Sequence, residues 1–233
     1  MFREHMRHLA ARGICGIPLA EFESVMSAER FLHKPAVLIT FDDGSRDCLT
    51  DALPVLTEFD HSATAFLITG RMQGSNDGLS PYGNALSWDE ARTLQDSGRF
   101  ALQSHSHSHS RWQFDDAGHM QLAEELRRSR ATLASELGGG IDRFCHLAWP
   151  WGRCSLVSES TAMDLGYTYQ YLVQKGAITH SGATLRLPRL CCDGMPTVNF
   201  VRWIDVLTNP FRTYAANRIF GSIRKWRHGL SYE

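Results

Sequence analysis

Apolar residues along this chain gather in short runs that alternate with longer amphipathic stretches. The run at 36–40 is continuous enough to predict a strand buried on both faces, as in a parallel sheet. Similar runs predict further strands at 63–69, 100–103, 144–148, 167–173 and 185–190.

The stretches between these runs carry apolar residues at helical spacing. They predict helices at 2–12, 18–26, 49–59, 87–96, 117–137 and 155–165. Ser87 and Glu90 have the spacing of a capping box, and Gly98 and the glycines at 138–140 end two of the helices. Alternating strands and helices predict an α/β fold with a parallel sheet, whose right-handed crossovers place every strand's C-terminal end at one edge.

The composition favours one folded domain with a full core. The chain has 233 residues, of which 43% are hydrophobic and 21% charged. A net charge of -1 gives no field that would attract nucleic acid, so none is expected as a partner. The six cysteines contain no CxxC pair and predict free, mostly buried thiols.

No apolar run approaches the length of a membrane span, and the first residues lack the build of a secretory signal. The sequence as written therefore predicts a cytoplasmic protein, with export left open if the true start lies upstream. We expect a domain at 1–208, including the N-terminal helices, and a tail at 209–233. The tail has a basic amphipathic pattern that could touch an anionic membrane, dock a partner or pack back on the domain.

Two polar segments follow predicted strands and could carry chemistry. Residues 40–44 read Thr-Phe-Asp-Asp-Gly, and residues 105–109 read His-Ser-His-Ser-His. Two imidazoles and a carboxylate form a three-ligand set for a divalent metal that leaves positions open for water and substrate. A helical turn would bring His105 and His109 together, whereas an extended backbone would align His107 with them. Each segment alone could also be a solvated loop or a polar turn.

Together these segments resemble two motifs of the polysaccharide deacetylase family, also called the NodB-homology or carbohydrate esterase 4 family. The resemblance runs from about residue 2 to 202 and includes Ala-Thr-Ala-Phe at 63–66, the helix start at Trp88 and Pro-Trp-Gly at 150–152. The aromatic-Pro-aromatic-Gly form of this last motif is closer to the poly-N-acetylglucosamine deacetylase branch. The resemblance implies a distorted (β/α)7-type barrel and the removal of N-acetyl groups from sugars in a polysaccharide or glycan precursor.

The family resemblance also implies roles for individual residues. One divalent metal, zinc in preference to cobalt or nickel, would be bound by Asp43, His105 and His109. Asp42 would be the general base, Arg189 would orient it and lower its pKa, and His107 would fall at a variable position. Substrate-binding residues would be Pro150, Trp151 and Gly152, with the Trp151 backbone N–H aimed at the oxyanion. Trp149 could stack on a sugar or belong to the core.

One part of the family pattern is missing. No L-x-x-H-like motif supplies a general acid near the C-terminus, and the branch's Tyr-His strand would lie before Phe2. An upstream start, replacement by His5 or His180, or loss of catalysis could explain this, although both histidines are expected to be ordinary and solvent-exposed. The alternatives to a deacetylase are a catalytically impaired carbohydrate-binding or assembly protein and a hydrolase of another amide.

Overall fold

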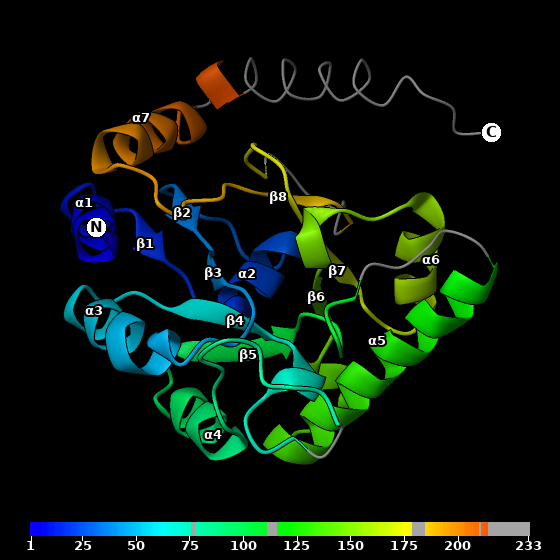
Figure 1. The fold of residues 1–233 in the computed structure, drawn as a ribbon. Helices are drawn as coiled ribbons and strands as arrows, with labels where there is room; N and C mark the ends of the chain where they lie inside the picture. The colour runs from blue at the N-terminus through cyan, green and yellow to red at the C-terminus, as the bar shows by residue number, and fades with distance from the viewer. Residues whose placement is uncertain (76–77, 111–115, 179–184, 210, 214–233) are drawn as a thin grey trace.

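The computed structural model describes residues 1–75, 78–110, 116–178, 185–209 and 211–213 (Figure 1). Its helices are α1 (Phe2–Ala11), α2 (Leu19–Met26), α3 (Leu53–Glu58), α4 (Trp88–Asp96), α5 (Asp116–Leu137), α6 (Leu156–Asp164) and α7 (Thr197–Leu207). Its strands are β1 (Cys15–Gly16), β2 (Ala36–Val37), β3 (Ile39–Phe41), β4 (Ala63–Leu67), β5 (Phe100–Ser104), β6 (His146–Ala148), β7 (Tyr169–Val173) and β8 (Leu187–Arg189). Short helical turns are η1 (Cys48–Ala52), η2 (Thr69–Arg71), η3 (Ile141–Arg143) and η4 (Pro150–Gly152).

Within the described ranges, six strands form one sheet in the order β3-β4-β5-β6-β7-β8, and every neighbouring pair is parallel. The sheet curls with helices around its outer side, and α1 and α7 lie together at its open end (Figure 1). This arrangement confirms the predicted parallel α/β fold of the barrel type. Since β3 and β8 are the two ends of the strand order, the curl leaves them as its opposite borders.

The first predicted strand differs from expectation. Residues 36–37 form β2, which pairs with β1, and residues 39–40 belong to β3, which begins the main sheet; Leu38 lies between the two strands. All five residues are only half-buried, so the prediction of a strand buried on both faces is wrong here. The physical reason is position: β3 is a border strand beside a cavity, whereas the fully buried β4 lies inside the sheet.

Local sequence signals account for much of the rest. The capping box at α4 is confirmed, because the Ser87 hydroxyl accepts from Glu90 N at 3.3 Å and the Glu90 carboxylate accepts from Ser87 N at 3.0 Å. Helix α7 was not predicted, and it packs against α1 through the buried Phe200 and Ile204.

The six cysteines are free, as predicted, but Cys48 is the one that is fully buried. In the ranges given above, no helix is long and apolar enough to cross a membrane. The pattern predicted for the tail falls on residues that, from 214 onward, lie outside the described part of the chain.

Arg130 of α5 holds the loops that lead into β6 and β7. Its side chain is buried and donates to the carbonyls of Phe144 at 2.8 Å, Ile141 at 3.0 Å and Leu165. The guanidinium also lies 5.5 Å from the centroid of the Tyr167 ring. One planar group thereby satisfies carbonyls from two separate loops, which a lysine could not do.

We predict that Arg130→Ala lowers the free energy of unfolding by about 3 kcal/mol, because it leaves several buried carbonyls without donors. Urea denaturation at neutral pH would measure the change. Arg127→Ala is the control: Arg127 lies on the same helix, is exposed and pairs with Glu124. That variant should change stability by about 0.5 kcal/mol or less. Equal effects of the two substitutions would contradict the assignment.

Candidate metal centre

Four strand ends bring the predicted site residues together. Asp42 and Asp43 follow β3, His105 follows β5, η4 follows β6, and Arg189 ends β8. Because all these strands are parallel, their C-terminal ends meet at one edge of the sheet. The segments that the sequence pattern placed at one edge of the sheet do lie at that edge.

Asp43, His105 and His109, which we call the carboxylate–histidine triad, place their ligand atoms within 4.8 Å of one another. Asp43 Oδ1 lies 3.5 Å from His105 Nε2 and 3.7 Å from His109 Nε2. His105 Nδ1 is 2.7 Å from the carbonyl oxygen of Ala148 and donates to it, so the lone pair on Nε2 faces Asp43. These donors fit a divalent metal ion, because the three ligand atoms converge on one point. The other ring nitrogen of His105, Nδ1, is already hydrogen-bonded to the Ala148 carbonyl.

The backbone that achieves this convergence is neither of the two predicted forms. After β5 the chain bends without forming a helix or continuing as a strand, and Ser106 (φ 67°) and His109 (φ 59°) adopt left-handed conformations. The Ser106 hydroxyl accepts from His109 N at 3.1 Å, and Glu125 of α5 accepts from Ser108 N at 2.8 Å. Side chains within and beyond the segment therefore hold a strained turn.

His107 points away from the triad even though it lies between two of its members. Its buried ring bonds to the Thr69 hydroxyl through Nδ1 at 3.0 Å. The ring packs so closely on Gly70 that a Cβ there would lie 2.7 Å from His107 Nε2. The absence of a side chain at Gly70 thus allows His107 to turn inward.

Asp42 makes a bidentate ion pair with Arg189. Arg189 Nη1 donates to Oδ1 at 2.6 Å and Nη2 donates to Oδ2 at 2.8 Å. Burial raises the pKa of Asp42, but His105, Arg189 and His109 together outweigh burial and hold the pKa below its ordinary value. An ionised carboxylate therefore lies beside the triad, with Asp42 Oδ2 at 3.9 Å from His105 Nε2.

The pKa shifts within the triad favour ligand forms of the imidazoles. Burial lowers the pKa of both His105 and His109, which keeps the rings neutral. The pKa of Asp43 is raised by burial, and the neighbouring Asp42 carboxylate adds to the rise. Excess negative charge in a half-buried place is the situation that a bound cation relieves.

The segment after β6 divides its two tryptophans between core and surface. Trp149 is 1% exposed and donates from Nε1 to Gln170 at 3.0 Å, so it belongs to the core. Trp151 is 53% exposed, and its ring centroid lies 5.0 Å from that of His109. The left-handed turn needs Gly152, because a Cβ there would lie 2.7 Å from the backbone nitrogen of Val173. Pro150 is buried beside it.

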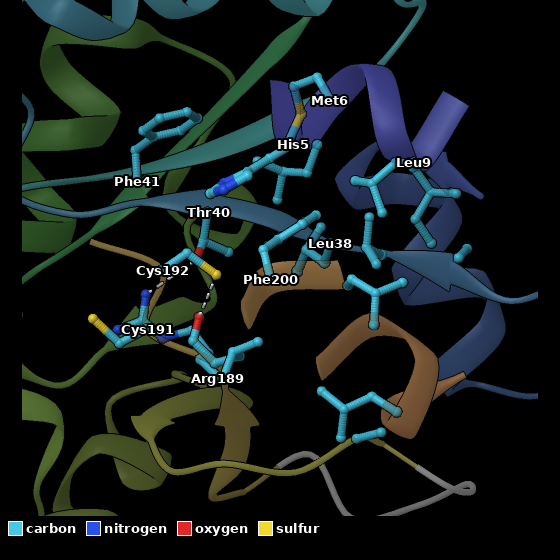
Figure 2. A pocket seen from close by; sticks show the side chains of 18 of the residues that line it. His5, Met6, Leu9, Leu38, Thr40, Phe41, Arg189, Cys191, Cys192 and Phe200 are labelled. Atoms are coloured by element: carbon cyan, nitrogen blue, oxygen red, sulfur yellow. Dashed lines mark hydrogen bonds between the residues drawn. The ribbon is translucent and has the colours of Figure 1, made fainter. Parts of the chain in front are cut away.

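A cavity of about 1600 Å³ adjoins the site between β3, β8, α1 and α7 (Figure 2). Asp42, Asp43 and Arg189 line it, together with His5. His5 is 3% exposed and stacks on Phe200 at 4.1 Å, so the prediction that it is solvent-exposed is wrong. The cause is α7, which covers α1 and was not predicted. His180 lies outside the described residues.

Two contributors to the site had no usable signal in the sequence. The first is the carbonyl of Ala148, since a backbone acceptor does not depend on residue type. The second is Tyr82, whose ring lies 5.6 Å from that of His109 and is 40% exposed. A single exposed tyrosine in a polar stretch of sequence does not indicate which site it faces.

A parallel α/β sheet that gathers a carboxylate–histidine triad and an arginine-paired aspartate at its C-terminal edge defines the class: an α/β protein with a candidate site for a divalent metal. Comparison with protein families then identifies the group. A family model for polysaccharide deacetylases matches residues 30–170, more than half of the chain. The chain belongs to the polysaccharide deacetylase family.

Individual relatives agree with this assignment. A curated poly-β-1,6-N-acetyl-D-glucosamine N-deacetylase from Staphylococcus epidermidis is 25% identical over 195 residues, which cover 81% of this chain and 65% of the relative. A second curated relative, from Bacillus subtilis, is matched over 59% of its length. The chain thus spans less than two thirds of the curated relatives that it matches.

Solved structures share the fold at lower identity. IcaB from Ammonifex degensii superposes with a TM-score of 0.72 at 21% identity, covering 87% of each chain. A de-N-acetylase from Aggregatibacter actinomycetemcomitans gives a TM-score of 0.73 at 19% identity, covering 84% of this chain and 87% of the other.

We predict that Arg189→Met raises the pKa of Asp42, because the substitution removes the paired cation and keeps the side chain's bulk. Since the folded-state pKa lies below the ordinary 3.8, the stabilisation from Asp42 is present above that value and is lost as the pH falls through the folded pKa. The variant should lose this part of its stability at neutral pH. Carbon-13 NMR titration of the Asp42 carboxyl group would measure the shift.

Arg153→Met is the matched control, because Arg153 is an exposed arginine that follows η4 on the same rim. It should leave the pKa of Asp42 unchanged. If Arg189→Met also leaves that pKa unchanged, the ion pair does not set the charge of Asp42.

Proposed function

We propose that this protein is a metal-dependent hydrolase that removes N-acetyl groups from an N-acetylated sugar in a polysaccharide or glycan precursor. The observation that carries the proposal is the ionised Asp42, held by Arg189 within 4 Å of the ligand face of His105. Family membership and the activity for which the S. epidermidis relative is named support N-acetylglucosamine as the sugar.

Asp43, His105 and His109 would hold the metal, and zinc suits two imidazoles and one carboxylate better than magnesium or calcium would. Cobalt and nickel are accepted by the same donors. When bound, such an ion supplies Lewis acidity and stabilises developing negative charge. The hydrogen bond from His105 Nδ1 to the Ala148 carbonyl fixes the orientation of the imidazole, so that Nε2 would face the metal ion.

Asp42 would act as the general base that takes a proton from the attacking water as the oxygen adds to the acetyl carbonyl. Arg189 keeps Asp42 deprotonated and fixes both carboxylate oxygens, so the base is oriented before substrate arrives. The backbone N–H of Trp151 is our candidate donor to the oxyanion, since the left-handed turn at Trp151 follows the strand end beside the triad. The proton taken from water must reach the departing nitrogen, which leaves as the amine with release of acetate.

Trp151 and Tyr82 would form the sugar platform. Their ring centroids lie 5.0 Å and 5.6 Å from that of His109, both rings are tilted against the imidazole, and both side chains are substantially exposed. Exposed aromatic faces next to a reaction centre suit the apolar faces of pyranose rings.

We predict that Asp42→Asn reduces acetate release from N-acetylglucosamine oligomers by about 10²- to 10⁴-fold, because an amide cannot accept the proton. Asp42 is not a member of the triad, so zinc content measured by atomic absorption should stay the same. Asp43→Asn is the matched variant and should lose zinc as well as activity. Retained activity in Asp42→Asn would rule out the base assignment.

Trp151→Ala should weaken oligosaccharide binding by roughly fivefold, because an exposed aromatic contact is worth about 1 kcal/mol. Calorimetric titration in the Asp42→Asn background would measure affinity without turnover. Ile141→Ala is the control, because Ile141 is an exposed apolar residue that precedes β6 and so lies toward the other edge of the sheet. Unchanged affinity in Trp151→Ala would remove Trp151 from the platform.

The second candidate is a carbohydrate-binding protein that keeps the metal site without turnover. It is favoured by the absence of an L-x-x-H-like motif near the C-terminus of the given sequence. Assays of the purified protein distinguish the two candidate functions. Acetate release well above that of free zinc supports the hydrolase, whereas oligosaccharide binding without release supports the binding protein.

A further inference from the structure

A second group of metal-ligating side chains lies at the opposite end of β6 from the carboxylate–histidine triad. Glu23 of α2, Cys145 and His146, which we call the Glu23 cluster, place a carboxylate oxygen, a thiol and an imidazole nitrogen within 4.8 Å of one another. His146 is the first residue of β6 and Cys145 precedes it, whereas the triad lies at the C-terminal ends of the strands. The proposed deacetylation makes no use of the Glu23 cluster.

The three donors converge on one carboxylate oxygen. Glu23 Oε1 lies 2.8 Å from His146 Nε2 and 3.9 Å from Cys145 Sγ. Zinc bonds of about 2.0 to 2.3 Å arranged tetrahedrally separate their ligand atoms by roughly 3.2 to 3.7 Å. The two distances to Glu23 Oε1 lie on either side of this range, and the Glu23 side chain, which is 38% exposed, has room to adjust both.

Neighbouring aromatic residues fix the imidazole. The His146 side chain is fully buried, and its ring stacks on Tyr169 at 4.3 Å with an interplanar angle of 6°. Its Nδ1 lies 2.8 Å from the Tyr171 hydroxyl. In the metal-free structure Nε2–H donates to the Glu23 carboxylate, and Nδ1 accepts from the Tyr171 hydroxyl. When a metal takes the Nε2 lone pair, the ring proton moves to Nδ1, which then donates to the Tyr171 oxygen. A ligating histidine whose other nitrogen is held in this way is the usual arrangement in metal sites.

The charge balance also suits a divalent cation. When Zn²⁺ binds, Cys145 releases one proton, and its thiolate and the Glu23 carboxylate together neutralise the two positive charges. The His146 ring stays neutral, because its proton moves from Nε2 to Nδ1 as Nε2 binds the metal, so charge and protons both balance.

We propose that Glu23, Cys145 and His146 form a second, structural metal site for zinc or another thiolate-preferring divalent ion, with water as the fourth ligand. The site joins α2 to β6, which are separated by more than 100 residues of sequence. This inference stands independently of the deacetylase proposal, because the two sites share no ligand.

Cobalt provides a direct test in the full chain. A thiolate ligand gives bound Co²⁺ a near-ultraviolet charge-transfer band, which the cysteine-free triad cannot produce. The measurements use a Cys191→Ser/Cys192→Ser background, because these adjacent thiols next to Asp193 could bind cobalt themselves. We expect two equivalents of cobalt, one of which produces the band.

Matched variants assign each equivalent. Cys145→Ser should lose the charge-transfer band and one equivalent of bound cobalt. Cys154→Ser should keep the band and both equivalents. Asp43→Asn should lose one equivalent of cobalt but keep the band. Tyr171→Phe should weaken the thiolate-linked equivalent by about 10- to 100-fold, since it removes the partner of Nδ1. Glu23→Gln tests the cluster at a partly exposed position, where folding is least at risk, and should also weaken that equivalent.

The opposite results overturn the proposal. It fails if the background protein binds one equivalent without the band, or if Cys145→Ser retains the band. Circular dichroism of each variant establishes folding, and if Cys145→Ser does not fold, the decision rests on Glu23→Gln and Tyr171→Phe. Failure of the cluster would leave acetate release by the triad unaffected, so the two proposals are tested separately.

Discussion

The ion pair between Asp42 and Arg189 joins the two borders of the curled sheet. In the described part of the chain, β3 and β8 share no backbone ladder, yet the residue after β3 and the last residue of β8 meet through two short charged hydrogen bonds. The same contact closes the curl at its C-terminal edge and keeps a carboxylate ionised beside two histidines. Architecture and acid–base chemistry therefore depend on one guanidinium, whose planar fork makes both bonds at once.

Sequence patterns predicted well those features that depend on local periodicity or on short motifs. The alternating elements, the α4 capping box and the meeting of Asp43, His105 and His109 at one edge all follow from the printed residues. The failures have a common cause, because they depend on neighbours distant in sequence. The exposure of β3 depends on its border position, and the burial of His5 depends on α7. The turn after β5 depends on hydrogen bonds made by Ser106 and Glu125.

Strand β6 connects the two polar clusters of this protein. It is three residues long, with His146 at one end facing Glu23 and Ala148 at the other end accepting from His105. Arg130 holds the loop that enters this strand through the Phe144 carbonyl. A displacement of β6 along its axis would therefore disturb both ends together, and the packing of fully buried side chains around it resists such a movement.

The orientation of His105 rests on a carbonyl of the main chain. Replacing the Ala148 side chain leaves that acceptor chemically intact, so residue-by-residue substitution would not reveal its role. Side chains at this position can change over evolutionary time within the limits set by packing, while the hydrogen bond persists as long as the strand keeps its place. The constraint is thus inherited through the path of the backbone, and comparing residue identities among relatives would give no sign of it.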